Sequence, residues 1–154
     1  MTLPRPPACW PFVVTRVLHR AGWYPGRDVA PQVEAWRRLL TVEGGFAWFP
    51  AAEVALREFG GLKLRQLAEA GNVIFRAVDL DPAVHVLEEN WFGECEAEVG
   101  ERLFPLGTLD QSEMYLAVGE SGAVYALTSG IYLCIGDSMA WALRYLVLGR
   151  KPTP

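Results

Sequence analysis

Two short stretches decide how this chain folds: Ala21-Gly22-Trp23-Tyr24-Pro25-Gly26-Arg27 and Glu58-Phe59-Gly60-Gly61-Leu62. In each of them, closely spaced glycines stand beside large apolar residues. Glycine enters left-handed backbone conformations without steric cost, so it ends helices cleanly. Both stretches are therefore predicted to be places where a helix stops and the chain turns against packed aromatic side chains.

Helical periodicity surrounds these stretches and continues beyond them. Apolar residues recur at three- and four-residue spacing, and Asp28 is a good N-cap for the second helix. Glycines stand at the ends of the periodic segments. The predicted helices are Pro11 to Gly22, Asp28 to Gly44, Pro50 to Gly60, Leu87 to Val99 with Gly100 as terminator, and Asp137 to Gly149.

The remaining apolar segments have the composition of strands. Three of them, Met114–Val118, Ala123–Leu127 and Ile131–Ile135, are joined by glycine-containing turns and predict a meander. Val73–Val78 is predicted to pair with the segment before it in a hairpin, although Lys63–Ala70 also fits a short helix. The prediction is one α+β domain, with N-terminal helices, an antiparallel sheet with a meander and a C-terminal helix. Residues 1–11 form an irregular arm, and residues 12–150 form the domain.

Charge is distributed unevenly along the 154 residues, although the formal net charge is only −4. Residues 1–76 contain ten basic and six acidic side chains, whereas residues 77–143 contain one basic and twelve acidic side chains. Nucleic acid is a poor partner for such a segment, because phosphate binding needs clustered lysine and arginine. The acidic segment is predicted to face a basic protein; a merely solubilising acidic surface is the alternative.

The lengths of the apolar runs and the spacing of the cysteines indicate the cellular compartment. No apolar stretch approaches the roughly 20 residues that a membrane helix needs, and residues 1–11 lack the long apolar run of a signal peptide. Cys9, Cys95 and Cys134 lie far apart and form no CxxC pair, so they are predicted to be reduced thiols. We therefore expect a cytoplasmic protein that does not associate with membranes.

Residues suited to catalysis are scarce. His19 and His85 are the two histidines, and both are predicted to be ordinary surface or capping groups. The sequence contains no HExxH, GxSxG or GxGxxG motif, so neither enzymatic activity nor a cofactor is predicted. Asp79 and Asp81 form a DxD at the end of a predicted strand, and a divalent cation there is the alternative to a simple turn. Pro82 explains the turn without a metal, so no metal site is predicted.

Carboxylates and two tyrosines make up the predicted partner-binding surface. Glu94 and Glu98 lie one helical turn apart, which indicates a solvated acidic side rather than paired catalytic carboxylates. The two tyrosines stand in the meander, where one sheet face is expected to be exposed, and exposed aromatic residues are common interface anchors. The predicted set is Asp79, Asp81, Glu88, Glu89, Glu94, Glu96, Glu98, Tyr125 and Tyr132.

The order and spacing of the glycine turns and apolar residues resemble the SUKH superfamily of toxin-immunity proteins, in particular its third subfamily. The resemblance covers nearly the whole chain, from Phe12 to Gly149. Its residues form caps, turns and core, so it supports the fold more than the partner. They are Gly22, Trp23, Pro25, Gly26, Arg27, Phe59, Gly60, Gly61, Leu62, Leu103, Phe104, Pro105, Gly107, Val124, Tyr125, Gly136, Leu143 and Gly149.

This resemblance implies an immunity protein that binds and neutralises a cognate polymorphic toxin by stoichiometric blocking. The toxin would be a basic domain, a nuclease or deaminase effector, and the immunity protein a monomer or weak homo-oligomer. Our leading hypothesis places the acidic segment Asp79–Glu101 in the basic active-site cleft of that toxin. The alternatives are a regulatory or scaffolding binding module of the same fold without a toxin partner, and a small enzyme or ligand-binding protein.

Overall fold

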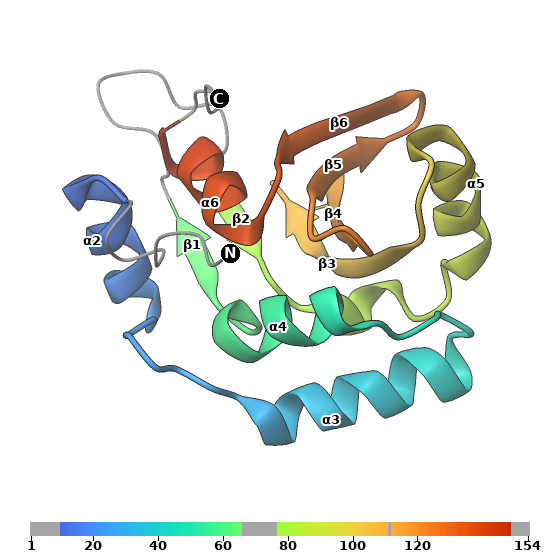
Figure 1. The fold of residues 1–154 in the computed structure, drawn as a ribbon, viewed down its shortest axis with the longest axis horizontal. Coiled ribbons are helices and arrows are strands. Elements are labelled where there is room, and N and C mark those ends of the chain that lie inside the picture. Colours follow the sequence, from blue (N-terminus) through green and yellow to red (C-terminus); the bar gives the residue numbers. More distant parts are fainter. Residues whose placement is uncertain (1–9, 66–76, 111, 149–154) are drawn as a thin grey trace.

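A computed structural model describes residues 10–65, 77–110 and 112–148 of the chain. Figure 1 shows a curled antiparallel sheet surrounded by helices. The six strands of this sheet lie in chain order, β1 to β6, and each is hydrogen-bonded to the next along the sequence. The structure confirms a single α+β domain with helices before the sheet and a helix after it.

α2, α4 and α5 end at glycines, as predicted, and Gly44 follows the π-helical turn that continues α3. Gly22 and Gly100 follow α2 and α5 in the left-handed conformation, at φ +108° and +87°. A side chain disfavours that conformation, so glycine stops the helix at low cost. In the described part of the chain, the helices are α2 (Phe12–Ala21), α3 (Ala30–Arg38), α4 (Pro50–Phe59), α5 (Glu89–Val99) and α6 (Met139–Leu148), with a π-helical turn η1 (Leu39–Glu43) and a 3₁₀ turn η2 (Pro82–His85).

The predicted N-cap of the second helix is wrong. Val29 occupies the N-cap position of α3, and no side chain caps the helix there. The carboxylate of Asp28 instead accepts hydrogen bonds from Nε and Nη2 of Arg57, at 3.0 and 2.6 Å. A bidentate bond to an arginine 29 residues away in the sequence outweighs the local capping preference.

The predicted starts of α5 and α6 are each two residues early. Leu87 fits the apolar periodicity of α5, but its side chain is 90% exposed and the helix begins at Glu89. α6 begins after Ser138, whose carbonyl accepts from the N–H of Ala142 and so opens the helical hydrogen bonding. Periodicity alone does not fix a helix start, because a residue outside the hydrogen-bonded turns can extend the pattern.

The strands are β1 (Lys63–Arg65), β2 (Ala77–Asp79), β3 (Leu103–Leu109), β4 (Met114–Gly119), β5 (Val124–Thr128) and β6 (Ile131–Gly136). β4, β5 and β6 confirm the predicted meander. β1 pairs antiparallel with β2, with Leu64 opposite Val78. The alternative helix over Lys63–Ala70 is therefore wrong for its first three residues, and the rest of that segment lies outside the described residues.

Sequence analysis missed β3, which lies inside the sheet between β2 and β4. All seven of its residues are buried, so the strand shows no alternation of polar and apolar side chains. It also contains Pro105 and Gly107, which are uncommon in strand interiors. A bulge between these two residues accommodates them.

Aromatic side chains join the helical segments to the sheet. The ring of Phe104 on β3 meets Trp48 and Phe46 edge-on, with centroids 5.1 and 5.9 Å apart. Trp10 lies in the predicted irregular arm, yet it is buried, and its indole N–H donates to the carbonyl of Ala140 at 2.9 Å. The packed part of the domain thus includes Trp10.

Candidate functional site

α5 lies at one end of the molecule (Figure 1), and it carries exposed carboxylates. Glu89, Glu94 and Glu98 are exposed, and among the described residues none forms a hydrogen bond or ion pair with them. Glu96 turns inward and accepts from the backbone N–H that starts β3, at 2.9 Å. Burial, assisted by the charges of neighbouring glutamates, raises the pKa of the Cys95 thiol to about 11. α5 thus presents negative charge that the rest of the described chain leaves unneutralised.

Asp79 and Asp81 have partners of their own at the end of β2. Asp79 forms an ion pair with Arg65 across β1 and β2, at 3.0 Å. Asp81 accepts from the backbone N–H of Ala83, at 3.0 Å, and caps η2. The described residues include no group of three or more His, Cys, Asp or Glu side chains placed to hold a metal ion. Asp79 therefore links β2 to β1, and Asp81 stabilises the turn that leads into η2.

His85 is buried, with 1% of its surface exposed, so its prediction as a surface group is wrong. Its Nε2 lies 2.8 Å from the carbonyl oxygen of Gly107, and its Nδ1 lies 2.7 Å from a carboxylate oxygen of Glu88. Tyr115 donates to the other Glu88 oxygen at 2.8 Å, and this bond raises the pKa of Tyr115. A carbonyl accepts only, so Nε2 is the donor to Gly107, and Nδ1 faces the carboxylate of Glu88. Both ring nitrogens are engaged, which leaves His85 no free nitrogen to act as a base on a substrate.

A hollow of about 230 Å³ opens beside this network. Glu88 and Trp91 line it from the α5 side, and Tyr115 and Leu127 line it from the sheet. Tyr132 stands opposite Leu127 in the β5–β6 register and is 37% exposed, so it lies on the same sheet face. Among the described residues the lining has no lysine or arginine; its other members are Ser112, Glu113, Thr128 and Ser129. The structure thus brings two of the predicted residues, Glu88 and Tyr132, to one acidic and aromatic face, whereas the side chain of Glu89 lies beside Gly45.

Tyr125 is engaged inside the molecule. Its hydroxyl donates to Glu101 at 2.6 Å, and Ser121 donates to the same carboxylate from its N–H and hydroxyl, at 2.8 and 2.9 Å. Burial and the bond to Glu101 raise the pKa of Tyr125. Burial alone would raise the pKa of Glu101, but the hydrogen bonds from Tyr125 and Ser121 outweigh it and lower that pKa. Sequence analysis missed this role of Glu101, because its partners lie 20 and 24 residues away.

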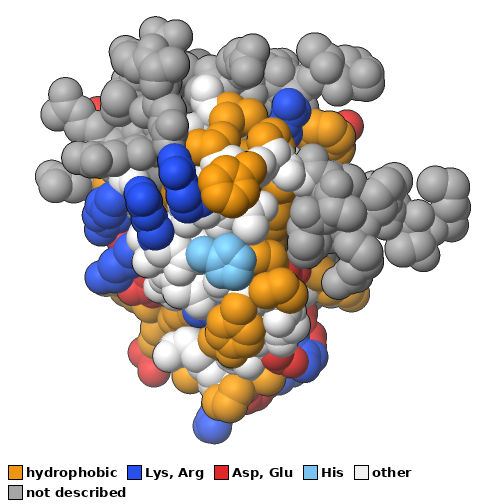
Figure 2. Space-filling model, turned by 90° about the vertical axis from the view of Figure 1, so that its left-hand side faces the viewer, with side chains coloured by type: hydrophobic (Ala, Val, Ile, Leu, Met, Phe, Trp, Pro, Cys, Tyr) orange, Lys and Arg blue, Asp and Glu red, His pale blue; other side chains and the backbone are white. Residues whose placement is uncertain are grey.

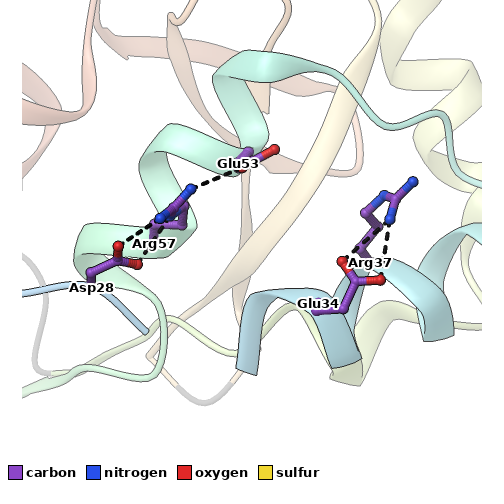
Figure 3. A network of polar contacts seen from close by, with 5 residues as sticks. All are labelled: Asp28, Glu34, Arg37, Glu53 and Arg57. Carbon is purple, nitrogen blue, oxygen red and sulfur yellow. Dashed lines mark hydrogen bonds and ion pairs between the residues drawn. The ribbon is translucent and has the colours of Figure 1, made fainter. Parts of the chain in front are cut away.

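A second polar cluster lies on α3 and α4 (Figure 3). Arg57 binds Asp28 and Glu53, at 2.6 and 3.1 Å, and these hydrogen bonds raise its pKa. Arg37 binds Glu34 at 3.2 Å. The charges are paired and exposed, and surface ion pairs of this kind contribute little to stability. We assign no chemistry to this cluster.

Comparison with known proteins identifies the family. A family model of the SUKH-3 immunity protein matches residues 10–149, which is most of the chain. This chain belongs to the SUKH-3 immunity protein family. The resemblance stated from the sequence is confirmed. A comparison with curated proteins and one with solved structures each gave no match.

Three of the glycines on which the resemblance was based serve close packing in this structure. A Cβ on Gly60 would lie 2.5 Å from the ring of Trp36, and one on Gly136 would lie 2.5 Å from the backbone of α6. A Cβ on Gly107 would collide with the carbonyl oxygen of Asp79. These glycines therefore serve the packing of the fold. In the described part of this SUKH-3 protein, every helix is too short or too polar to cross a membrane.

Proposed function

We propose that this protein neutralises a cognate polymorphic toxin in the cytoplasm by stoichiometric binding, without turnover. Membership of the SUKH-3 family supports the immunity role. One observation carries the mode of binding: Glu94 and Glu98 are exposed on α5 without partners in the described chain, three and seven residues after Trp91, which lines the hollow. Unpaired charge attracts an oppositely charged partner, and aromatic residues in a hollow provide anchoring contacts.

A toxin that acts on nucleic acid fits this surface. A nuclease or deaminase needs a positively charged cleft to hold phosphate. The carboxylates of α5 would compete with phosphate for that cleft, and the field of the acidic segment would accelerate association. Nucleic acid itself remains a poor partner for such a surface.

The predicted residues divide into two groups with different roles. Those proposed to contact the toxin are four exposed residues, Glu89, Glu94, Glu98 and Tyr132, and the half-buried Glu88, which lines the hollow. The others support the surface from inside through the bonds described above: Asp79, Asp81, Glu96 and Tyr125. A test of the interface should therefore change only members of the first group.

The experiment reverses charge on α5 and measures protection against the toxin encoded next to the gene. Glu94→Lys combined with Glu98→Lys should slow association at low salt at least about tenfold, since electrostatic steering sets the rate. The matched control is Glu34→Lys combined with Asp137→Lys, which changes net charge equally at exposed sites on α3 and before α6. We expect this control to associate at nearly the wild-type rate.

Two outcomes would contradict the proposal in different ways. If the α5 variant, correctly folded, protects as well as the wild type, α5 is not the interface. If the wild-type protein does not bind the neighbouring toxin at all, a regulatory or scaffolding module of the same fold becomes the better interpretation.

A further inference from the structure

The end of the molecule opposite α5 has the reverse character. Figure 1 places α2 and α5 at opposite ends of the long axis, and Figure 2 shows lysine and arginine side chains gathered beside exposed hydrophobic ones on the α2 side. Phe12 is 77% exposed and Tyr24 is 55% exposed. The guanidinium of Arg16 lies 5.6 Å from the ring centroid of Phe12. No aspartate or glutamate occurs between Phe12 and Tyr24 in the sequence.

The elements packed against α2 extend this basic and aromatic character. α6 and β1 both contact α2. On α6, Trp141 is 37% exposed, and the guanidinium of Arg144 lies 5.6 Å from its ring centroid. On β1, which is an edge strand, Lys63 is exposed. Within the described residues, neither Arg20 nor Lys63 forms an ion pair.

We propose that this basic aromatic face of α2, with its neighbours on α6 and β1, docks onto the α5 surface of a second copy of the chain. Arg20 and Lys63 would face Glu94 and Glu98 of that copy. Arginine and aromatic side chains are enriched at protein interfaces, and complementary charge fixes the orientation of the partners.

A second copy is favoured because one molecule carries both complementary surfaces at its two ends. Contacts between unlike surfaces are heterologous, so one copy binds the next head to tail and the assembly stays open unless the rotation closes. The net charge of −4 opposes association at long range, whereas the charged ends attract at short range. The result is a weak, concentration-dependent and salt-sensitive assembly.

This inference rests on the α5 surface that the proposed function assigns to the toxin. Because the α5 carboxylates would contact both the toxin and the second copy, one copy cannot bind the toxin and the next copy through α5 at the same time. Binding of toxin should therefore dissolve the assembly into one-to-one complexes.

The test is sedimentation velocity of the full chain across protein concentration, at two salt concentrations. We use about 0.1 M NaCl, where the Debye length is about 10 Å, and about 1 M NaCl, where it is about 3 Å. The wild type should form larger species as concentration rises at low salt and lose them at high salt. Phe12→Ala, which removes an exposed ring without changing charge, should also weaken association.

A charge swap makes the test specific. Variant one carries Arg20→Glu and Lys63→Glu, and variant two carries Glu94→Lys and Glu98→Lys. Each variant alone should associate at least about tenfold more weakly than the wild type, since like charges then face each other. An equimolar mixture should regain association, because the two reversed surfaces are complementary. The Glu34→Lys and Asp137→Lys control should behave like the wild type.

A wild type that remains monomeric at low salt would overturn the inference, as would a mixture that fails to regain association. In the first case the basic face belongs to a different, acidic partner. Protection against the toxin reports separately on the proposed function. Variant one keeps α5 intact and should still protect; if it protects while the wild type never self-associates, the inference fails and the function stands. If self-association is found but variant two still protects, the toxin surface has been assigned wrongly.

Discussion

Removing the hydroxyl of Tyr125 tests whether Glu101 holds the connection between α5 and β3 to the turn between β4 and β5. In the structure, Tyr125 donates to Glu101 at 2.6 Å, and Ser121 supplies two more hydrogen bonds to the same carboxylate. A Cβ on Gly119 would collide with that carboxylate, so it lies directly against β4. We compare Tyr125→Phe, Glu101→Gln and the double variant with the wild type.

The magnitude follows from the contacts. A hydrogen bond to a charged group contributes about 1.5–3 kcal/mol to stability. Tyr125 and Glu101 are only partly buried, and Ser121 keeps its bonds when Tyr125 is changed. We therefore expect Tyr125→Phe to lower the free energy of unfolding by about 1–2 kcal/mol. In a chain of this length, such a loss lowers Tm by roughly 2–8 °C.

The assay is urea unfolding monitored by tryptophan fluorescence, analysed as a double-mutant cycle. A coupling of about 1 kcal/mol between Tyr125 and Glu101 is expected. The matched control is Tyr132→Phe, because the Tyr132 hydroxyl has no hydrogen bond within the described residues; it should change stability by less than about 0.5 kcal/mol.

Acid provides an independent check of the same bond. The pKa of Glu101 is lowered in the folded state, so its contribution to stability is complete above the ordinary glutamate pKa of about 4.3. It is lost as pH falls through the lower folded-state pKa. The difference in stability between wild type and Glu101→Gln should therefore shrink on acidification. A coupling energy near zero between Tyr125 and Glu101 at neutral pH would refute this account of their hydrogen bond. A stability difference between wild type and Glu101→Gln that grows in acid would refute it as well.

Three further predictions concern single buried or helical positions. Gly107→Ala should destabilise the protein by more than about 2 kcal/mol, because the added Cβ collides with the carbonyl of Asp79. Gly93→Ala, in open space on α5, should instead stabilise the protein by up to about 1 kcal/mol. The urea unfolding midpoints of the two variants measure both effects. Phe59→Ala should cost about 3–5 kcal/mol in chemical unfolding, since Phe59 is 3% exposed and leaves a cavity; a cost below about 1 kcal/mol would show that the site collapses. The thiol of Cys95, buried and with a pKa of about 11, should react with a thiol reagent at neutral pH only after unfolding, and fast labelling of the folded protein would contradict its burial.

Most helices could be predicted from the sequence because their signals are local. Periodic apolar residues define a face, and a glycine such as Gly22 or Gly100 ends the helix through its own backbone freedom. β3 could not be predicted in this way. A strand buried on both faces has no alternation, and Pro105 and Gly107 argue against a strand until the bulge is seen.

The negative charge of the candidate site could be predicted from the sequence, but the hydrogen-bond and ion-pair partners of its residues could not. The acidic run was evident from the sequence, as was its placement on a helix. Which carboxylates are free could not be deduced, because the partners of Asp79 and Glu96 lie on other elements. The buried position of His85 was missed for the same reason, since Gly107 approaches it from β3.

The sequence by itself determined the fold class, the ends of several helices at glycines, the family resemblance and the acidic character of the segment that includes α5. These depend on backbone conformation, periodicity and composition, which act within a few residues of each other. Only the tertiary structure decided that Glu89, Glu94 and Glu98 stay unpaired in the described chain and that Glu101 accepts the hydrogen bond of Tyr125. It also decided that a basic and aromatic end of the molecule lies opposite the end that carries α5. Those outcomes depend on which distant side chains the sheet and helices bring within bonding distance, and hydrogen bonds and charge pairs act only over such distances.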